Sequence, residues 1–267
     1  MKKLIPKNQS AIDINALFRK RIGMQVENIT FESLSNILEK TAENIPFENL
    51  CIIENRTSNI TKESLIEKIL VKNEGGLCYE LNLILYFFLK ENGFDAALIG
   101  GVIYNNDIKK YQKLGRTHVV ILVTYKEQKY LIDTGFGGNL PLKPVPLTEE
   151  SVSSKNGEFR VKRVNGEYGD YVFEMRLKHR DTDWKIGYAF DTKKSISDLS
   201  EINMIQKIIA EHKDSPFNKS PLITRLTGGG NLILTNNSFT QRTEGVVSKE
   251  TIDSMKFKEL LKQHFGM

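Results

Sequence analysis

The stretch Asn73–Asn82 (NEGGLCYELN) decides how the sequence is interpreted. Two glycines precede Cys78, and a mainly apolar run from Leu81 to Leu89 follows it, before Asn92-Gly93. This pattern predicts a tight turn that leads into a helix, with the Asn-Gly pair at the C-terminal end. Cys78 would then lie in the first turn, where unpaired N–H groups and the helix dipole favour a thiolate. A buried structural thiol is the alternative, because free cysteine is among the most buried residue types.

The composition limits the classes of function. The chain has 267 residues, 40% hydrophobic and 27% charged, which is enough for a sizeable core. The formal net charge is +5, but the basic residues are scattered, so we expect no nucleic-acid partner. The longest uninterrupted apolar run, Leu83–Leu89, is too short to cross a membrane, so we expect no membrane partner either.

The cysteines and the start of the chain predict a reducing compartment. Cys51 and Cys78 are too few for a disulfide framework, and neither lies in a Cys-x-x-Cys motif. Lys2-Lys3 is followed at once by Pro6 and polar residues, without the apolar core of a signal peptide. We therefore expect a cytoplasmic protein, and we predict no metal site.

The apolar spacing predicts an α+β fold in three consecutive segments. Residues 1–93 form a helical bundle that carries Cys78, with helices over 13–23, 31–44, 61–72 and after Cys78. Residues 94–192 form a central antiparallel, β-barrel-like domain, with strands over 96–104, 118–125, 129–133, 158–165, 169–178 and 183–190. Residues 193–267 form an α/β lid, with a helix over 197–212 and a hairpin around Gly228–Gly230.

A cysteine nucleophile needs a base, and the base needs a group that orients it. Among the four histidines, His118 begins an apolar strand, whereas the others lie in polar stretches. Asp133 ends the next strand, beyond a turn at Lys126–Gln128. Because direct pairing across that turn does not place His118 opposite Asp133, we expect a bulge or bend to bring them together. The set is that of a Cys-His-acid triad, although His118 also suits a core position and Asp133 also suits a turn cap.

The motifs resemble those of the arylamine N-acetyltransferase family. Residues 75–82 (GGLCYELN) resemble its active-site motif, and Thr117-His118 and Asp133–Gly137 resemble its histidine and aspartate motifs. The likeness covers nearly the whole chain, through Ile45–Leu50, Gly100–Tyr104, Ser215–Phe217 and Phe265-Gly266. The resemblance implies the same three-part fold, with a catalytic core like that of cysteine proteases.

The resemblance also implies a reaction. An acetyl group would move from acetyl-CoA to a thioester on Cys78, and then to the nitrogen of an arylamine, arylhydroxylamine or hydrazine. His118 would act as the base and Asp133 would orient it, giving ping-pong kinetics. The family implies a role in xenobiotic metabolism.

Substrate contacts follow from the same resemblance. Phe47 and Phe136 are the candidates for the apolar walls around a small aromatic amine or hydrazine. Contacts with acetyl-CoA are expected from Gly135, Gly137, Gly138 and Ser215.

One position departs from the family pattern. Glu74 stands where the family usually has Arg, directly before the two glycines. A carboxylate close to Cys78 would oppose a thiolate. We therefore expect either that Glu74 points away from Cys78 or that a neighbour such as Lys72 compensates its charge.

Two other classes of function use the same residues. A cysteine hydrolase or a transglutaminase-like enzyme would employ this triad with water or a peptide as the acceptor. A non-catalytic protein could bind CoA or an aryl ligand without forming an acetyl-enzyme.

Overall fold

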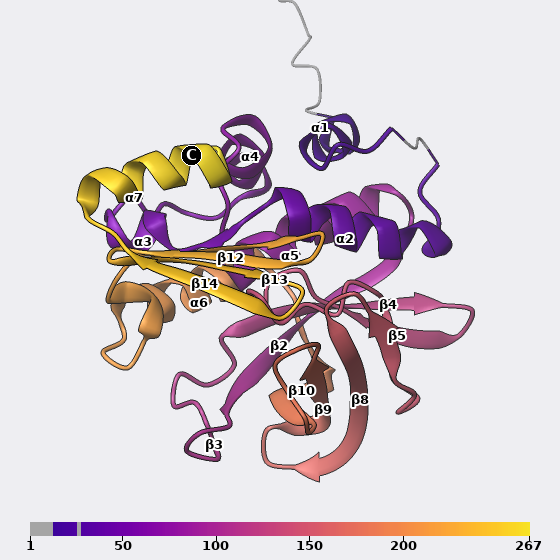
Figure 1. Ribbon diagram of the computed structural model, residues 1–267. Helices are drawn as coiled ribbons and strands as arrows, with labels where there is room; N and C mark the ends of the chain where they lie inside the picture. The colour runs from indigo at the N-terminus through magenta and orange to yellow at the C-terminus, as the bar shows by residue number, and fades with distance from the viewer. Residues whose placement is uncertain (1–12, 26–27) are drawn as a thin grey trace, which may run out of the picture.

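The computed structural model describes residues 13–25 and 28–267, and residues 1–12 of the first predicted segment lie outside them (Figure 1). The first part of the chain is helical, as predicted. Its elements are α1 (Ile14–Arg21), a 3₁₀ turn (Phe31–Ser33), α2 (Leu34–Asn44), α3 (Leu50–Ile53), α4 (Lys62–Leu65), a π-helical stretch (Ile66–Val71) and α5 (Cys78–Glu91). Among the described residues, none of the helices combines the length and apolar character needed to cross a membrane.

The middle of the chain forms an antiparallel sheet that is nearly closed into a barrel. Within the described residues, the strands are β2 (Asp95–Asn105), β3 (Lys110–Tyr111), β4 (His118–Tyr125), β5 (Gln128–Ile132), β6 (Val145–Pro146), β7 (Val152–Ser154), β8 (Gly157–Gly166), β9 (Gly169–Leu177) and β10 (Lys185–Ile196). Their order is β6-β5-β4-β2-β10-β9-β8-β7, with β3 paired to β2. Contact between β6 and β8 brings distant parts of the sheet together.

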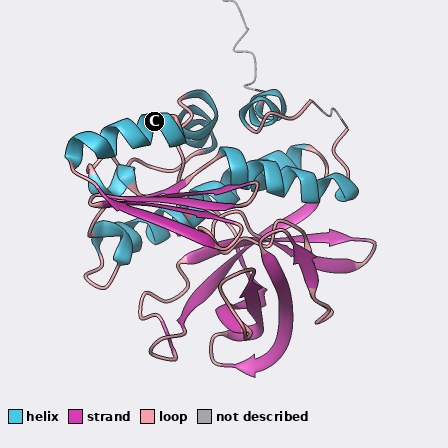
Figure 2. Ribbon diagram, viewed as in Figure 1, coloured by secondary structure: helices cyan, strands magenta, loops and turns pink. Residues whose placement is uncertain are grey.

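The last part combines helices with a second sheet. It contains α6 (Leu199–Glu211), a 3₁₀ turn (Pro216–Asn218), β11 (Leu222–Thr227), β12 (Gly230–Thr235), β13 (Ser238–Thr243), β14 (Val246–Thr251), α7 (Ser254–Leu260) and a π-helical turn (Leu261–Phe265). The hairpin expected around Gly228–Gly230 is confirmed by the pairing of β11 with β12. The sheet order is β1-β11-β12-β13-β14, and β1 (Phe47–Glu48) comes from the first part of the chain. Figure 2 shows most helices on one side of the molecule and the larger sheet on the other.

Helix α5 lies at the centre of the molecule. It packs against β2 and β4 and against α1, α4 and α6. This position explains why its sequence is apolar on nearly every side, since a helix surrounded by protein has no solvent face.

Strand β4 separates two hydrophobic cores. Val119, Ile121 and Val123 pack in the core around α5, whereas Val120 and Leu122 pack inside the barrel. This alternation follows from the two-residue period of a strand. His118 therefore lies on the barrel side of β4. Whether residues 1–93, 94–192 and 193–267 are independent domains stays a prediction.

Candidate active site

The turn before Cys78 needs a glycine at position 75 because another segment passes beside it. The Gly76 N–H donates to the Pro46 carbonyl (3.2 Å), and the Glu48 N–H donates to the Gly76 carbonyl (3.0 Å). A Cβ on Gly75 would lie 2.1 Å from the Pro46 carbonyl oxygen, so a larger residue does not fit. The predicted helix start is confirmed: α5 begins at Cys78.

Cys78 is buried beside the turn that follows β5. Its Sγ lies 3.5 Å from the Thr117 carbonyl oxygen. A Cβ on Gly135 would lie 2.5 Å from the Cys78 Cα, so this glycine lets the loop after Asp133 close against the helix. The structure thus gives Gly135 a packing role against Cys78, and its expected contact with CoA stays a prediction.

His118 and Asp133 meet without the bulge or bend that we expected. The β4–β5 turn has two residues, Lys126-Glu127, and the ladder runs to Ile121↔Ile132 without a register shift, all within the described part of the chain. A two-residue turn places both side chains on one face of the sheet. They are then diagonal neighbours on two adjacent strands, about 7–8 Å apart. The expectation was wrong because it counted Gln128 as part of the turn, which placed the two side chains on opposite faces.

Asp133 accepts hydrogen bonds from four groups around it. Its Oδ2 accepts from His118 Nε2 (2.8 Å) and from the Tyr188 hydroxyl (2.9 Å). Its Oδ1 accepts from Asn82 Nδ2 (2.9 Å) and from the Gly135 N–H (2.7 Å). Asp133 thus caps its turn and also holds the imidazole, and its catalytic role stays a prediction.

Asn82 and Tyr188 were not singled out from the sequence. Asn82 lies four residues after Cys78, on the same helix face, so its place in the quoted motif was a usable signal. It also fixes the loop, because its Oδ1 accepts from the Thr134 N–H (2.8 Å). Tyr188 lies on β10, which pairs with β2, and nothing in the local sequence distinguishes it from a core residue.

The imidazole of His118 is held in position and charged. Its ring lies 4.6 Å from the Tyr188 ring and 5.1 Å from the Phe136 ring, between centroids. Burial alone would lower the pKa of His118, but Asp133 and Cys78 oppose this effect and raise it from 6.5 to about 10. Because Nε2 bonds to Asp133, Nδ1 is the nitrogen left to face Cys78. The arrangement therefore suits an imidazolium beside a sulfur anion.

The stability of the protein should depend on this charge. A pKa raised by folding means that the His118 contribution is complete below about pH 6.5 and is lost as the pH rises through about 10. We expect the free energy of unfolding to fall over this range by roughly 4 kcal/mol more in the wild type than in His118→Gln. Urea unfolding at both pH values measures this difference, and equal pH dependence in the two proteins would contradict the charged imidazole.

Cys78 opens into a cavity of about 210 Å³ whose wall is mainly apolar. Both predicted acceptor contacts, Phe47 and Phe136, line it. The other lining residues are Ile103, Gln112, Leu114, Thr117, His118, Gly135, Ile209, Pro216 and Phe217. All three parts of the chain therefore contribute to the wall.

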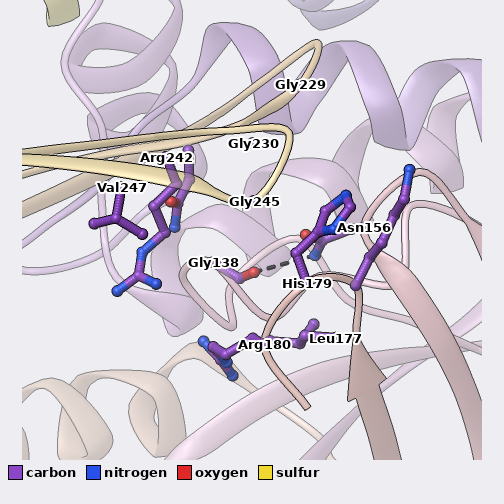
Figure 3. Close-up of a pocket in the computed structure, with 12 residues that line it drawn as sticks. Gly138, Asn156, Leu177, His179, Arg180, Gly229, Gly230, Arg242, Gly245 and Val247 are labelled. Carbon is purple, nitrogen blue, oxygen red and sulfur yellow. Dashed lines mark hydrogen bonds between the residues drawn. The ribbon is translucent and has the colours of Figure 1, made fainter. Parts of the chain in front are cut away.

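The remaining residues expected to contact CoA, Gly137, Gly138 and Ser215, do not lie together in one cavity. A Cβ on Gly137 would lie 3.9 Å from the Phe47 ring. Gly138 lines a second cavity, where its carbonyl accepts from Asn156 Nδ2 (3.1 Å) and where Arg180 and Arg242 also lie (Figure 3). Ser215 is fully buried, and its Oγ accepts from the Phe217 N–H (3.3 Å), so it caps the turn that carries Phe217.

Glu74 faces a cavity other than that of Cys78. Its Oε2 lies 3.9 Å from Arg56 Nη1 and 3.8 Å from Cys51 Sγ. Lys72 is paired with Glu67 (3.5 Å) and does not compensate Glu74. The departure from the family pattern thus places no carboxylate in the wall of the Cys78 cavity.

Comparisons with known proteins find acetyltransferases of similar sequence and fold. A family model described as N-acetyltransferase matches residues 30–267. An uncharacterized acetyltransferase of Bacillus subtilis (strain 168), YvcN, is 38% identical, over 92% of this chain and 95% of its own. The (BACCR)NAT3 arylamine N-acetyltransferase from Bacillus cereus, whose crystal structure is described as revealing a unique Cys-His-Glu catalytic triad, is 42% identical, with a TM-score of 0.91 over 96% of this chain and 99% of its own. The Mycobacterium marinum arylamine N-acetyltransferase, solved in complex with CoA, shares the fold at 21% identity, with a TM-score of 0.81 over 94% of this chain and 92% of its own.

Proposed function

Because the chain belongs to the arylamine N-acetyltransferase family, which moves an acetyl group from acetyl-CoA through a cysteine thioester to an amine nitrogen, we propose that Cys78 carries the acetyl group. One observation supports this proposal above the others: Cys78, at the start of α5, lies beside an imidazole that bonds to a buried carboxylate. This is the set that activates a sulfur nucleophile.

The first half of the reaction acetylates the enzyme. The Cys78 thiolate attacks the thioester carbonyl of acetyl-CoA, and the bond from that carbon to the CoA sulfur breaks. The His118 imidazolium gives its proton to the departing CoA thiolate. The Tyr79 N–H, at the second position of α5, is our candidate donor to the oxyanion that forms on the way.

The second half transfers the acetyl group to the acceptor. The amine nitrogen attacks the acetyl carbon, His118 takes the proton that the nitrogen loses, and Cys78 leaves as the thiolate. Asp133 keeps the imidazole oriented and stabilises its charged form in both halves.

We propose that the acceptor is a small aromatic amine or hydrazine with a single ring. The support comes from the Cys78 cavity, which is mainly apolar and has a volume of about 210 Å³. Apolar cavities of about 150 Å³ bind benzene, so one ring with its amino group fills most of the available space. Phe47 and Phe136 would provide the walls on either side of the ring, and foreign aromatic amines of this size would be suitable acceptors.

We propose that CoA binds between Gly135 and Gly138, with its anionic end toward the second cavity. Arg180 and Arg242 suit phosphate groups there, because guanidinium groups bind phosphate oxygens in pairs. Gly137 would let the chain of CoA pass close to the backbone, and Ser215 would act through the turn that it caps. The two unpaired cysteines support a reducing setting, and we propose the cytoplasm.

Intact-mass spectrometry tests the proposal. Incubation with acetyl-CoA or p-nitrophenyl acetate should give one acetyl adduct, absent in Cys78→Ala and retained in the matched control Cys51→Ala. An arylamine should discharge the adduct, and single-ring amines should do so faster than fused-ring amines.

The other outcomes separate the rival functions. A wild-type adduct that water removes as fast as any amine would identify a hydrolase. A folded wild type that forms no acetyl adduct would support a non-catalytic protein that binds CoA or aryl ligands.

A further inference from the structure

Behind the first turn of α5 lies a buried cluster of one cation and two carboxylates. Lys68, on the π-helical stretch, has a side chain that is 13% exposed. Its Nζ lies 2.6 Å from Glu80 Oε1 and 3.5 Å from Glu48 Oε1. The Glu80 and Glu48 side chains are 9% and 1% exposed, so all three charges are largely removed from water.

Both acidic residues of the cluster bond to the turn that positions Cys78, Glu80 through its carboxylate and Glu48 through its backbone. Glu80 Oε2 accepts from the Leu77 N–H (3.0 Å), the residue directly before the cysteine. Glu48 Oε2 accepts from the Leu50 N–H (2.5 Å), and the Glu48 N–H donates to the Gly76 carbonyl. Residues of the cluster therefore bond to both polar atoms of the peptide group that joins Gly76 to Leu77.

The two carboxylates need a cation between them. Burial raises the pKa of Glu48, Glu80 raises it further, and Lys68 opposes both effects. Burial would lower the pKa of Lys68, but Glu80 and Glu48 raise it, so the ammonium stays charged. Without Lys68, one carboxylate would have to take up a proton or move toward water, because two adjacent buried charges cannot both persist unpaired.

The backbone of Lys68 supports the same turn. Its carbonyl accepts from the Glu74 N–H (3.1 Å), which fixes the residue before the two glycines. The residue lies in a π-helical stretch, Ile66–Val71, and such wide turns are frequent at functional sites.

Position 74 lies within electrostatic reach of the same cluster. The Glu74 charge acts on Glu48, whose pKa it raises, and Glu74 lines the same cavity as Lys68 and Glu80. A cation at position 74 would therefore enter the cluster from the turn itself. In this chain the turn carries an acid, and the cation enters from the neighbouring helix.

We propose that Lys68 is a positioning residue for acetyl transfer: it supplies from the π-helical stretch the buried cation between Glu80 and Glu48, and through these two residues it fixes the helix turn that begins at Cys78. This inference rests on the proposed role of Cys78 as the acetyl carrier. Lys68 touches neither substrate nor the reacting atoms, and its effect passes through the two carboxylates.

Lys68→Met is the direct test, because Met has a similar length and no charge. We expect acetylation of Cys78 by p-nitrophenyl acetate to be about 100-fold slower, the size of effect produced by a small displacement of a reacting group. The loss should grow as the pH rises from about 6 to 9, because the unpaired carboxylates are both charged only at the higher pH. A purely structural loss of folded protein would lower the rate without adding this pH dependence.

Relocating the charge is the sharper test. In Lys68→Met/Glu74→Arg the cation returns from position 74, and we expect most of the rate and the wild-type pH profile to return. Glu74→Arg alone should leave the rate within about threefold of the wild type, since Glu74 is outside the Cys78 cavity. Lys72→Met is the matched control, because Lys72 is exposed and paired with Glu67, and its rate should be unchanged.

The outcomes separate this inference from the proposed function. Absence of an acetyl adduct in the wild type would count against Cys78 itself. A wild type that acetylates normally, together with Lys68→Met at the same rate and pH profile, would overturn the role of Lys68. So would a double variant that stays at the Lys68→Met rate or does not fold.

Discussion

Replacing Asp133 by Asn is expected to slow acetylation of Cys78 by about 10⁴-fold while leaving the protein folded. The Asn amide oxygen can keep the bonds to Asn82 and Gly135, which hold the loop. Its amide nitrogen then faces His118 Nε2 and donates where the carboxylate accepted. The imidazole must accept at Nε2 and carry its proton on Nδ1, so it can no longer take a proton from Cys78.

Adduct formation measured by mass spectrometry checks this expectation, with circular dichroism to confirm the fold. Tyr188→Phe is the graded comparison, because it removes one donor to Asp133 and leaves the His118 contact in place. It should slow acetylation by only about tenfold, the value of one hydrogen bond to a charged group. If Asp133→Asn also stayed within about tenfold of the wild type, Asp133 would not be the orienting acid.

Replacing Gly135 by Ala is expected to have the second large effect. The new methyl group would lie 2.5 Å from the Cys78 Cα and 2.9 Å from Asn82 Nδ2, closer than any stable contact. The loop after Asp133 must then withdraw from α5, which separates the imidazole from the sulfur. We expect acetylation to fall by about 100-fold or more and the free energy of unfolding to fall by about 1–3 kcal/mol.

Gly228→Ala is the matched control for this substitution. Among the described residues, no atom outside its immediate neighbours lies within 4 Å of a Cβ at Gly228, so the same chemical change should alter neither rate nor stability. Acetylation rates and urea unfolding of the two variants give the comparison. If Gly135→Ala kept the wild-type rate, the loop after Asp133 would accommodate a methyl group beside Cys78, and the expected steric clash would be contradicted.

Much of the fold and of the site could be predicted because its signals are local. The glycines before Cys78 and the apolar run after it define a helix start within a few residues. His118 and Asp133 stand at the ends of two adjacent strands, which the sequence also marks. Even here, a one-residue error in the turn reversed the face of Asp133, because strand faces alternate with every residue.

The rest depends on contacts between distant residues. Tyr188 reaches Asp133 only because β10 pairs with β2. The sequence of neither strand alone predicts the register of that pairing. The partners of Lys68 come from β1 and from α5. The spacing of apolar residues within one helix does not predict contacts between separate elements. The cavity around Cys78 likewise combines Phe47, Phe136 and Phe217 from three parts of the chain.

The pairing of the two-residue strand β1 with β11 has a consequence for synthesis. Phe47 and Glu48 pair with Thr224 and Ile223, more than half the chain later. Gly76 of the active-site turn forms a bridge with Phe47, and its carbonyl accepts from the Glu48 N–H. On the ribosome the helices form first, since N-terminal segments emerge and fold first. Until β11 has left the exit tunnel, β1 has no partner strand. The Cys78 cavity also lacks the part of its wall that Phe217 provides. We therefore expect Cys78 to accept an acetyl group only after β11 has been synthesised and has paired with β1.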